Sequence, residues 1–479
     1  MDTKLIGRQR ELGDIDRYVS DQKSHFIAVY GRRRVGKTFL IRKAFQDQFT
    51  FYTTGIAKGS LKEQLATFSI ALKKYFGNET MSTPKTWIDA FTFLIEQLEA
   101  DPSKKKVIFL DELPWMDNRN SKFINALEYF WNSWASGRPD ILLIVCGSSA
   151  SWMMNKLIKN KGGLYNRVTG KIKLNPFTLH ETKQYLESLG CQYDEFQCIQ
   201  TYMCFGGIPF YLSHFNKDWS ASQNINKLCF AENALFRSEY YVLYQSLFDN
   251  PENHIAIVEA IASKNKGILR SEIVKRSGIT DGGGLTRILT ELEESGFIRK
   301  YYNFNKTSRE AVYQLTDLFS LFHLSFLSKL QINDGNSWLN MINTPKQNTW
   351  SGYAFEILCI LHTHEIKREL GIDGILSNIS TWQNKAAQID LIIDRSDNVI
   401  NVIEIKFSNS EYTITKDYDT KLRNKLNEFK ESTKTRKALW LVMLTTFGLK
   451  NGPYNGIVQK SLTSDIFFQP KKDDLRSYL

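Results

Sequence analysis

The sequence GRRRVGKT at residues 31–38 directly follows the apolar run FIAVY at 26–30. A buried strand, a glycine-rich turn and the start of a helix, in that order, are the context of a phosphate-binding loop. The glycines let the backbone curl, so that successive N–H groups point at phosphate oxygens. We expect Lys37 to contact the β- and γ-phosphates and Thr38 to offer its hydroxyl to Mg²⁺. The predicted nucleotide-binding residues are Gly31, Arg32, Arg33, Arg34, Val35, Gly36, Lys37, Thr38 and Phe39.

A second apolar run, VIFL at 107–110, ends in the acidic pair Asp111 and Glu112. Such a run suits a central parallel strand, and open α/β sheets bind ligands at the carboxyl ends of their strands. We expect Asp111 to hold Mg²⁺ through water and Glu112 to orient and deprotonate the attacking water. The alternative is that Glu112 has only a positional role or is solvated, and does not activate water. Together with the loop, this strand predicts an ATP-hydrolysing enzyme with ATP and Mg²⁺ as cofactors.

The composition excludes several classes of protein. A chain of 479 residues is too long for one core, and 42% hydrophobic with 24% charged residues is typical of globular proteins. No apolar run is long enough to cross a bilayer and the N-terminus lacks the apolar stretch of a signal peptide, so we expect a cytoplasmic protein without a membrane partner. The net charge of +11 favours DNA or another nucleic acid as partner, although a generally basic surface is the alternative.

The first part of the chain alternates strands with helices, which predicts a parallel sheet in a three-layer α/β fold. Helices are expected at 61–76 and 121–134. The expected strands are 26–30, 49–54, 107–110, 141–145 and 171–174. Because Asn175-Pro176 ends this pattern, we place the ATPase core at 1–175 and an all-helical lid at 176–250.

From residue 251 the rhythm changes to three short helices and a β-hairpin, which predicts a winged helix over 251–318. The expected helices are 254–263, 269–277 and 285–295, and the second hairpin strand is 311–315. The pattern LxxLxxxGFI, which ends at Ile298, resembles the third helix and first wing strand of the winged-helix superfamily. Thr286, Arg287 and Thr290 are candidates for contacting a DNA major groove, and docking of this segment on the ATPase is the alternative.

The run IGRQREL at residues 6–12 resembles the GRxxEL box that precedes the phosphate loop in AAA+ and STAND-type ATPases. Together with YGRRRVGKT and FLDELPW, it resembles the prokaryotic, archaeal-type ATPase family with AAA+ cores over about residues 1–250. The loop arginines 32–34 are candidates for extra phosphate contacts. Variable positions of such loops more often point to solvent, and the family tolerates arginine there, so we expect exposed side chains with no part in catalysis.

The same resemblance implies three further roles at the nucleotide. Ser148 falls at the sensor position that reads the γ-phosphate, although a serine there can instead cap the next helix. Arg167 falls where AAA+ proteins carry an arginine finger, which usually acts in trans and would need a homo-oligomer; an ordinary surface arginine is the alternative. Pro209, in Gly207-Ile208-Pro209, matches a proline that packs on adenine in STAND relatives, or it only terminates a helix.

The tail, residues 319–479, opens with helices and continues with strands expected at 389–394, 399–407 and 438–444. Because side chains alternate along a strand, Glu404 and Lys406 are expected to share one face, and Asp390 is expected to lie on the face opposite its apolar neighbours. Those apolar neighbours are Ile389, Leu391 and Ile393.

A carboxylate on one strand followed by Glu-x-Lys on the next resembles the PD-(D/E)XK nuclease superfamily. The resemblance implies that Asp390 and Glu404 hold a metal such as Mg²⁺, that Lys406 holds or helps to deprotonate the nucleophile, and that Glu356 is an additional acidic ligand. An antiparallel hairpin with one solvated face would give the same alternation without any chemistry.

The sequence therefore predicts an α/β protein: a P-loop AAA+ sheet with a helical lid, a winged helix, and a restriction-endonuclease-like domain at 319–479. The predicted function is an ATPase that couples nucleotide state to a C-terminal domain that binds nucleic acid and is a candidate Mg²⁺-dependent nuclease. The alternative is a STAND-type signalling ATPase whose inactive nuclease fold serves protein interaction. The set Asp390, Glu404 and Lys406 favours the first.

Overall fold

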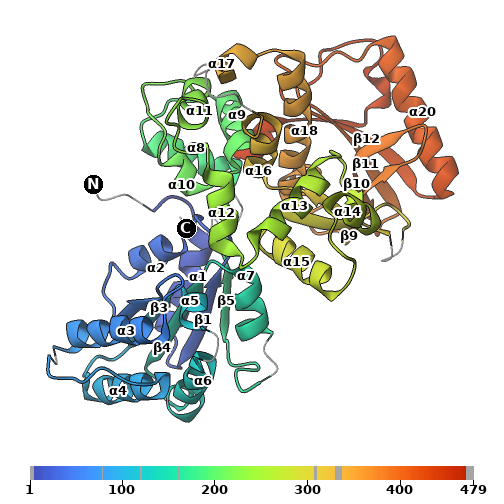
Figure 1. Ribbon diagram of the computed structural model, residues 1–479. Coiled ribbons are helices and arrows are strands. Elements are labelled where there is room, and N and C mark those ends of the chain that lie inside the picture. The colour runs from blue at the N-terminus through green and yellow to red at the C-terminus, as the bar shows by residue number, and fades with distance from the viewer. Residues whose placement is uncertain are drawn as a thin grey trace. The chain divides into compact units, whose positions relative to one another are not determined.

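The computed structural model describes residues 5–77, 79–118, 121–159, 162–306, 310–329 and 337–470. These residues form two compact units, one ending at Pro176 and the other spanning Phe177–Pro470 (Figure 1). The division falls one residue after the expected end of the ATPase core, while the expected outer limits at 1 and 479 lie outside the described residues. None of the helices in these ranges combines the length and the apolar character needed to cross a membrane.

The first unit contains a five-stranded sheet in which all strands run parallel, as predicted. The strands are β1 (His25–Tyr30), β2 (Phe51–Thr54), β3 (Lys106–Asp111), β4 (Ile141–Gly147) and β5 (Gly170–Lys173). Their order across the sheet is β2-β3-β4-β1-β5. Because β3 and β4 are buried along their whole length, their continuous apolar sequences are those of central strands.

Helices and apolar side chains cover this sheet. The helices of the first unit are α1 (Gln9–Ser20), α2 (Lys37–Ala44), α3 (Leu61–Phe76), α4 (Trp87–Ala100), α5 (Leu113–Met116), α6 (Phe123–Ser133) and α7 (Ala150–Trp152). Alternate residues of the strands, such as Ile108 and Leu110 of β3, join the apolar side chains of α3, α4 and α6 in one hydrophobic cluster. Side-chain oxygens of Ser60 and Thr86 cap the starts of α3 and α4, which sets where these covering helices begin.

The second unit begins with helices only, as predicted for 176–250. They are α8 (Leu179–Ser188), α9 (Glu195–Phe205), α10 (Pro209–Leu212), α11 (Ala221–Cys229) and α12 (Glu239–Leu247). Three helices and a small sheet follow, namely α13 (Pro251–Ala262), β6 (Ile268–Leu269), α14 (Arg270–Ser277), α15 (Gly283–Glu294), β7 (Ile298–Tyr302) and β8 (Ala311–Leu315). We call residues 251–318 the three-helix segment; its sheet has the antiparallel order β6-β8-β7, and β6 was not expected.

The tail contains a second five-stranded sheet, of mixed direction. Its elements are α16 (Leu318–Phe322), α17 (Ser337–Met341), α18 (Pro345–Leu361), α19 (Thr363–Glu369), β9 (Ser377–Gln383), β10 (Gln388–Arg395), β11 (Val399–Lys406), α20 (Lys416–Thr433), β12 (Ala438–Thr445) and β13 (Lys460–Thr463). The order is β13-β12-β11-β10-β9; the β9, β10 and β11 pairs are antiparallel and the β11, β12 and β13 pairs are parallel.

One expectation for β10 is wrong. The register between β9 and β10 shifts between Ile389 and Ile392, because β10 carries one extra residue there. Ile389 and Ile392 therefore pack in the same hydrophobic cluster, together with Val402, whereas strict alternation would place Ile389 with Leu391. The bulge lies directly beside Asp390.

The three-helix segment packs on the tail within the second unit. Asn303, just after β7, pairs with Thr381 of β9, and the backbone N–H of Phe304 donates to the Thr381 carbonyl over 2.9 Å. The ring of Phe304 lies 5.0 Å from that of Phe429 in α20. The residues that follow β7 thus contact both β9 and α20 of the tail.

Candidate nucleotide site and a lysine-paired carboxylate cluster

The phosphate-binding loop turns where β1 ends, and its backbone needs glycine. Gly31 has φ 142°, and a Cβ added to it would lie 2.2 Å from the carbonyl oxygen of Leu174. Gly36 has φ 88° and immediately precedes α2. Any larger residue at position 31 would push the loop away from the chain that follows β5, so this glycine is required by close approach as well as by conformation.

Lys37 lies under this loop rather than in solvent. Its side chain is buried, and Nζ donates to the carbonyl oxygens of Gly31 at 3.1 Å and Arg32 at 2.9 Å. The ammonium is therefore held inside the turn that would surround the phosphates. Phe39, two residues further along α2, is exposed.

The loop arginines do not all point to solvent as expected. Arg32 is only 6% exposed, so the expectation is wrong for this residue. The guanidinium carbon of Arg33 lies 5.9 Å from the centre of the Trp115 ring. Arg34 is half-buried and has φ 71°. Arg32 therefore lies inside the protein, and Arg33 lies against the ring of Trp115.

Thr38 and Asp111 meet at the carboxyl edge of the sheet. The Thr38 hydroxyl donates to Asp111 Oδ2 over 2.8 Å. Burial and the nearby charge of Glu112 raise the pKa of Asp111, while the hydrogen bond from Thr38 opposes the shift. A hydroxyl and a carboxylate oxygen are donors that Mg²⁺ accepts, so these two side chains fit the predicted ion.

Glu112 is bound by Ser148, which follows β4. Glu112 Oε2 accepts hydrogen bonds from the Ser148 backbone N–H at 3.1 Å and from its hydroxyl at 2.7 Å. Because β4 lies between β1 and β3, Ser148 is placed between the phosphate loop and the acidic pair. The alternative role for Ser148, capping α7, is not formed: the residue before that helix is Ser149, and its side chain makes no cap.

Arg167 lies far from the phosphate loop of its own chain. It is exposed in the turn before β5, and the register pairs Gly170 at the start of β5 with Ile27 in the first half of β1. Since β1 and β5 are parallel, Arg167 lies at the amino edge of the sheet, whereas the loop follows the carboxyl edge. A finger role for Arg167 is thus open only in trans, at the nucleotide of another copy of the chain.

We expect Arg167→Ala to leave ATP affinity unchanged and to lower ATP turnover by about 10³-fold, because a guanidinium stabilises charge that develops only during phosphoryl transfer. Mixing Arg167→Ala with Lys37→Ala chains is expected to restore part of the turnover, since each chain supplies what the other lacks. Lys171→Ala removes an exposed cation from β5 and is the matched control. Unchanged turnover in a strictly monomeric Arg167→Ala protein would remove the finger role.

Arg8, in the GRxxEL box, has a structural role that the sequence did not reveal. Its guanidinium is buried, and Nη2 donates to the carbonyl of Asn175 over 2.8 Å and to that of Val35 in the phosphate loop over 3.4 Å. One side chain therefore connects the loop to the residue that precedes Pro176, the last residue of the first unit.

Pro209 lies in the second unit and begins a helix. Ile208 precedes α10 and Pro209 is its first residue, a position where the missing N–H costs no helical hydrogen bond. The preceding helix, α9, already ends at Phe205, so Pro209 does not terminate it. Packing on adenine stays a prediction for this residue.

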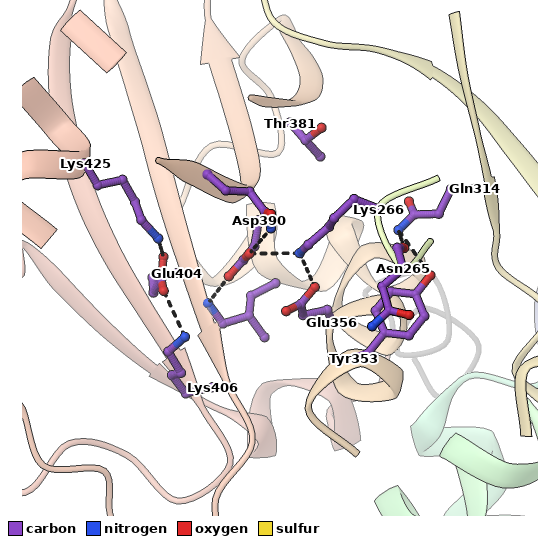
Figure 2. A network of polar contacts seen from close by, with 12 residues as sticks. Asn265, Lys266, Gln314, Tyr353, Glu356, Thr381, Asp390, Glu404, Lys406 and Lys425 are labelled. Carbon is purple, nitrogen blue, oxygen red and sulfur yellow. Dashed lines mark hydrogen bonds and ion pairs between the residues drawn. The ribbon is translucent and has the colours of Figure 1, made fainter. Parts of the chain in front are cut away.

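In the tail, Asp390 and Glu356 share one ammonium group. Lys266, from the loop between α13 and β6, bonds to Glu356 Oε2 and donates to Asp390 Oδ1 over 3.0 Å (Figure 2). The other oxygen of Asp390 accepts from the backbone N–H of Ile405 over 3.2 Å. Asp390 is thus bound on one side by β11 and on the other by the three-helix segment.

Glu404 has two lysine partners of its own. Lys406 Nζ lies 2.9 Å from Glu404 Oε1, and Lys425 of α20 bonds to Oε2. The hydroxyl of Tyr418, also from α20, donates to Oε1 over 2.7 Å. Figure 2 shows Asp390 between this group and Lys266, with Lys406 and Lys425 beside Glu404.

The pKa values follow from these charges. Burial raises the pKa of Glu356 to about 7, and the negative charge of Asp390 adds to the shift. Burial also acts to raise the pKa of Asp390, but Lys266, Lys425 and Lys406 lower it overall. For Lys266 burial acts to lower the pKa, yet Asp390 and Glu356 raise it overall. Asp390 and Lys266 are therefore an ion pair, and Glu356 shares their ammonium.

The predicted single metal shell is not formed. Within the described ranges, no three His, Cys, Asp or Glu side chains are grouped so that they can hold a metal ion. Asp390, Glu356 and Glu404 each bond to a lysine. An ammonium between Asp390 and Glu356 leaves no place for a second cation there, so the carboxylates as arranged do not fit the ion that the resemblance implied.

Sequence reasoning missed three contributors to this cluster, namely Lys266, Tyr418 and Lys425. Lys266 is 124 residues before Asp390, and neither it nor the two α20 residues belongs to the strand motif. The helix α20 itself carries a weak signal, because Tyr418 and Lys425 are seven residues apart and so lie on the same face.

One family of known proteins matches the first unit and the start of the second. Residues 5–215 match a family described as an ATPase domain predominantly from Archaea. An uncharacterized protein of Methanocaldococcus jannaschii is 25% identical over 412 residues, which are 84% of this chain and 87% of that protein. An uncharacterized ATP-binding protein of the same organism is 42% identical over 44 residues, 9% of this chain and 75% of that protein.

Solved structures show a weaker likeness. A Walker-type ATPase of Pyrococcus abyssi has a TM-score of 0.49 at 18% identity, covering 67% of this chain and 96% of that chain. The family match extends over the loop at 31–38, the acidic pair after β3 and the five-stranded parallel sheet. The chain is therefore a P-loop ATPase.

Proposed function

We propose that the chain is an ATP-hydrolysing switch whose nucleotide state controls a nucleic-acid-binding C-terminal domain. The observation that carries the ATPase part is the meeting of Thr38 with Asp111, and of Ser148 with Glu112, at one edge of the sheet. Thr38 lies in α2 after β1, Asp111 and Glu112 lie at the end of β3, and Ser148 follows β4, and these three strands are neighbours in the sheet. The carboxyl ends of parallel strands lie at the same edge of a sheet, and open α/β sheets bind their ligands there. The fold itself therefore brings these four side chains together.

The chain's own residues divide the work of hydrolysis. Lys37 would bind the β- and γ-phosphates, and the loop N–H groups would orient them. Thr38 and Asp111 would hold Mg²⁺, which neutralises phosphate charge when bound. Glu112 would accept the proton of the attacking water, and Ser148 would orient the Glu112 carboxylate, because its hydroxyl and N–H both bond to one oxygen.

The C-terminal part of the proposal rests on the mixed sheet and its charges. The paired part of β10 and β11 begins at Leu391 and Ile403. Asp390, Glu404 and Lys406 lie just beyond this end of the pairing, in one polar network (Figure 2). A net charge of +11 over the chain supports an anionic partner. We infer that the tail is a nuclease-like domain and that the three-helix segment is a winged helix.

A second candidate function is a STAND-type signalling switch in which the tail binds a protein. It is favoured by the pairing of Asp390, Glu356 and Glu404 with lysines, because carboxylates neutralised in this way serve structure rather than cleavage. On the third helix, α15, Arg287 pairs with Glu291, and the hydroxyls of Thr286 and Thr290 donate to backbone carbonyls of the same helix start. Thr286, Arg287 and Thr290, the side chains predicted to contact a DNA groove, therefore already have hydrogen-bond or ion-pair partners within the protein.

We expect the purified chain to bind duplex DNA with micromolar affinity at about 100 mM salt, because a basic surface that contacts phosphates gives binding in that range. We expect the affinity to differ by about fivefold or more between a non-hydrolysable ATP analogue and ADP, a typical coupling between two sites. Fluorescence anisotropy with labelled DNA measures both. Lys37→Ala, whose affinity for ATP we expect to be strongly reduced, is the control; at nucleotide concentrations that saturate only the parent, it is expected to show one DNA affinity in both conditions.

The same samples with Mg²⁺ also separate the two candidates. Cleavage that disappears in Glu404→Ala, with ATP turnover intact, establishes a nuclease, because the two sites lie in separate compact units. Absence of DNA and RNA binding under all nucleotide conditions would contradict the nucleic-acid function and leave the signalling switch.

A further inference from the structure

Lys266 is aimed at the carboxylates by a loop whose backbone is bound on both sides. The Tyr301 hydroxyl donates to the carbonyl of Lys266 over 2.6 Å, and the Gln314 amide donates to that of Asn265 over 2.9 Å. Gly267 has φ 79°, and a Cβ added there would lie 2.4 Å from the carbonyl oxygen of Tyr313. The loop is thus tied to β7 and β8, and its lysine is directed by the three-helix segment as a whole.

Among the described residues, Lys266 is the cation that bonds directly to both Glu356 and Asp390. Glu356 is on α18 and Asp390 is beside the bulge of β10, and their side chains are only 19% and 8% exposed. Buried carboxylates need a cation or protons, because isolated buried charge is very unfavourable. Two carboxylates with oxygens turned to one point are also the ligand type that a hard divalent cation prefers.

We propose that Lys266 is a built-in cation that occupies the divalent-ion position between Glu356 and Asp390 and keeps Mg²⁺ or Mn²⁺ out of it. The inference deepens the proposed nuclease-like function and rests on it. It accounts for a lysine between two of the three carboxylates that the resemblance implied as metal ligands, and we call this exclusion of the divalent ion the lock.

The lock can be tested by Mn²⁺ binding to the full chain without nucleotide, followed by electron paramagnetic resonance. Lys266→Met keeps the length of the side chain and removes its charge. We expect it to gain one Mn²⁺ site per chain with affinity at least about tenfold above that of the parent, because the ammonium of the parent occupies the position and repels a second cation at contact distance. Lys264→Met, which changes an exposed lysine two residues away, is expected to bind as the parent does.

Asp390→Asn in the Lys266→Met background is expected to remove the gained Mn²⁺ site. This loss would show that Asp390 is one of the ligands of that site. Two results would overturn the lock: Mn²⁺ binding by Lys266→Met equal to that of the parent, or a parent that already binds one Mn²⁺ through Asp390. If Lys266→Met and Lys266→Gln fold only when Mn²⁺ is added, the exchange of cations is supported. If neither folds with or without Mn²⁺, Lys266 is purely structural and the proposal is wrong.

This test uses no nucleic acid, so it separates the lock from the proposed function. A Lys266→Met chain that binds Mn²⁺ but neither binds nor cleaves DNA or RNA would leave the lock standing and reject the nucleic-acid function. A chain that binds DNA under nucleotide control but gains no Mn²⁺ site would do the reverse.

Discussion

Lys37→Ala is expected to lower the affinity for ATP by about 10²- to 10³-fold. The substitution removes a buried ammonium whose hydrogen bonds to the Gly31 and Arg32 carbonyls already place it inside the phosphate loop. Two charge-assisted hydrogen bonds to phosphate oxygens are worth about 3–4 kcal/mol together, which corresponds to this loss. Isothermal titration calorimetry with ATP measures it directly.

The control for this prediction is Arg42→Ala, which removes an exposed cation from the same helix, α2. It is expected to bind ATP with parental affinity, because its partner is Asp47 on the surface. Parental ATP affinity in Lys37→Ala, in a chain that retains its melting temperature, would show that the loop does not bind phosphate through this lysine.

Glu112→Gln is expected to retain ATP binding and to lower turnover by about 10²- to 10⁴-fold, the range for loss of a general base. An amide of the same shape can still accept the hydrogen bonds of Ser148, but it cannot take a proton from water. Single-turnover hydrolysis measured with saturating ATP separates this step from binding. Ser148→Ala is expected to lower turnover less, because it leaves the carboxylate in place and removes only one of two bonds that orient it.

Asp117→Asn is the matched carboxylate control for Glu112→Gln. Asp117 follows α5, and its Oδ2 accepts from the Trp152 indole over 3.2 Å, whereas Ser148 bonds to Glu112. It is expected to hydrolyse ATP at the parental rate. Hydrolysis at that same rate by Glu112→Gln would show that another group activates the water.

The nucleotide site was predictable because its parts depend on local sequence and on one rule of sheet geometry. The loop at 31–38 carries its glycines, lysine and threonine in one short stretch, and the run before Asp111 is apolar enough to be a central strand. Parallel strands then place Thr38, Asp111, Glu112 and Ser148 at one edge. What the sequence could not show was the burial of Arg32, because burial depends on which parts of the chain pack around the loop in the folded protein.

The C-terminal cluster was only partly predictable for a different reason. Strand alternation placed Glu404 and Lys406 together, and they form an ion pair at 2.9 Å. The partners that decide the character of the cluster come from elsewhere in the chain: Lys266 belongs to a loop before β6, and Lys425 to a helix after the motif. The bulge beside Asp390 was also missed, because an extra residue in a strand leaves no mark in the alternation of Ile389 to Ile393.

The Arg8 guanidinium, which reaches both the Val35 and the Asn175 carbonyls, has a thermodynamic consequence. Any displacement of Asn175 relative to the phosphate loop stretches or breaks one of these two bonds, so the geometry at the end of the first unit and the geometry of the empty or filled loop are energetically linked. Linkage is reciprocal. If ATP changes the equilibrium between two positions of Asn175 by some factor, a ligand that holds Asn175 in the favoured position raises the affinity for ATP by up to the same factor. A ligand of the second unit that acts through this residue is therefore detectable as a shift in ATP affinity alone, before its identity or its binding site is known.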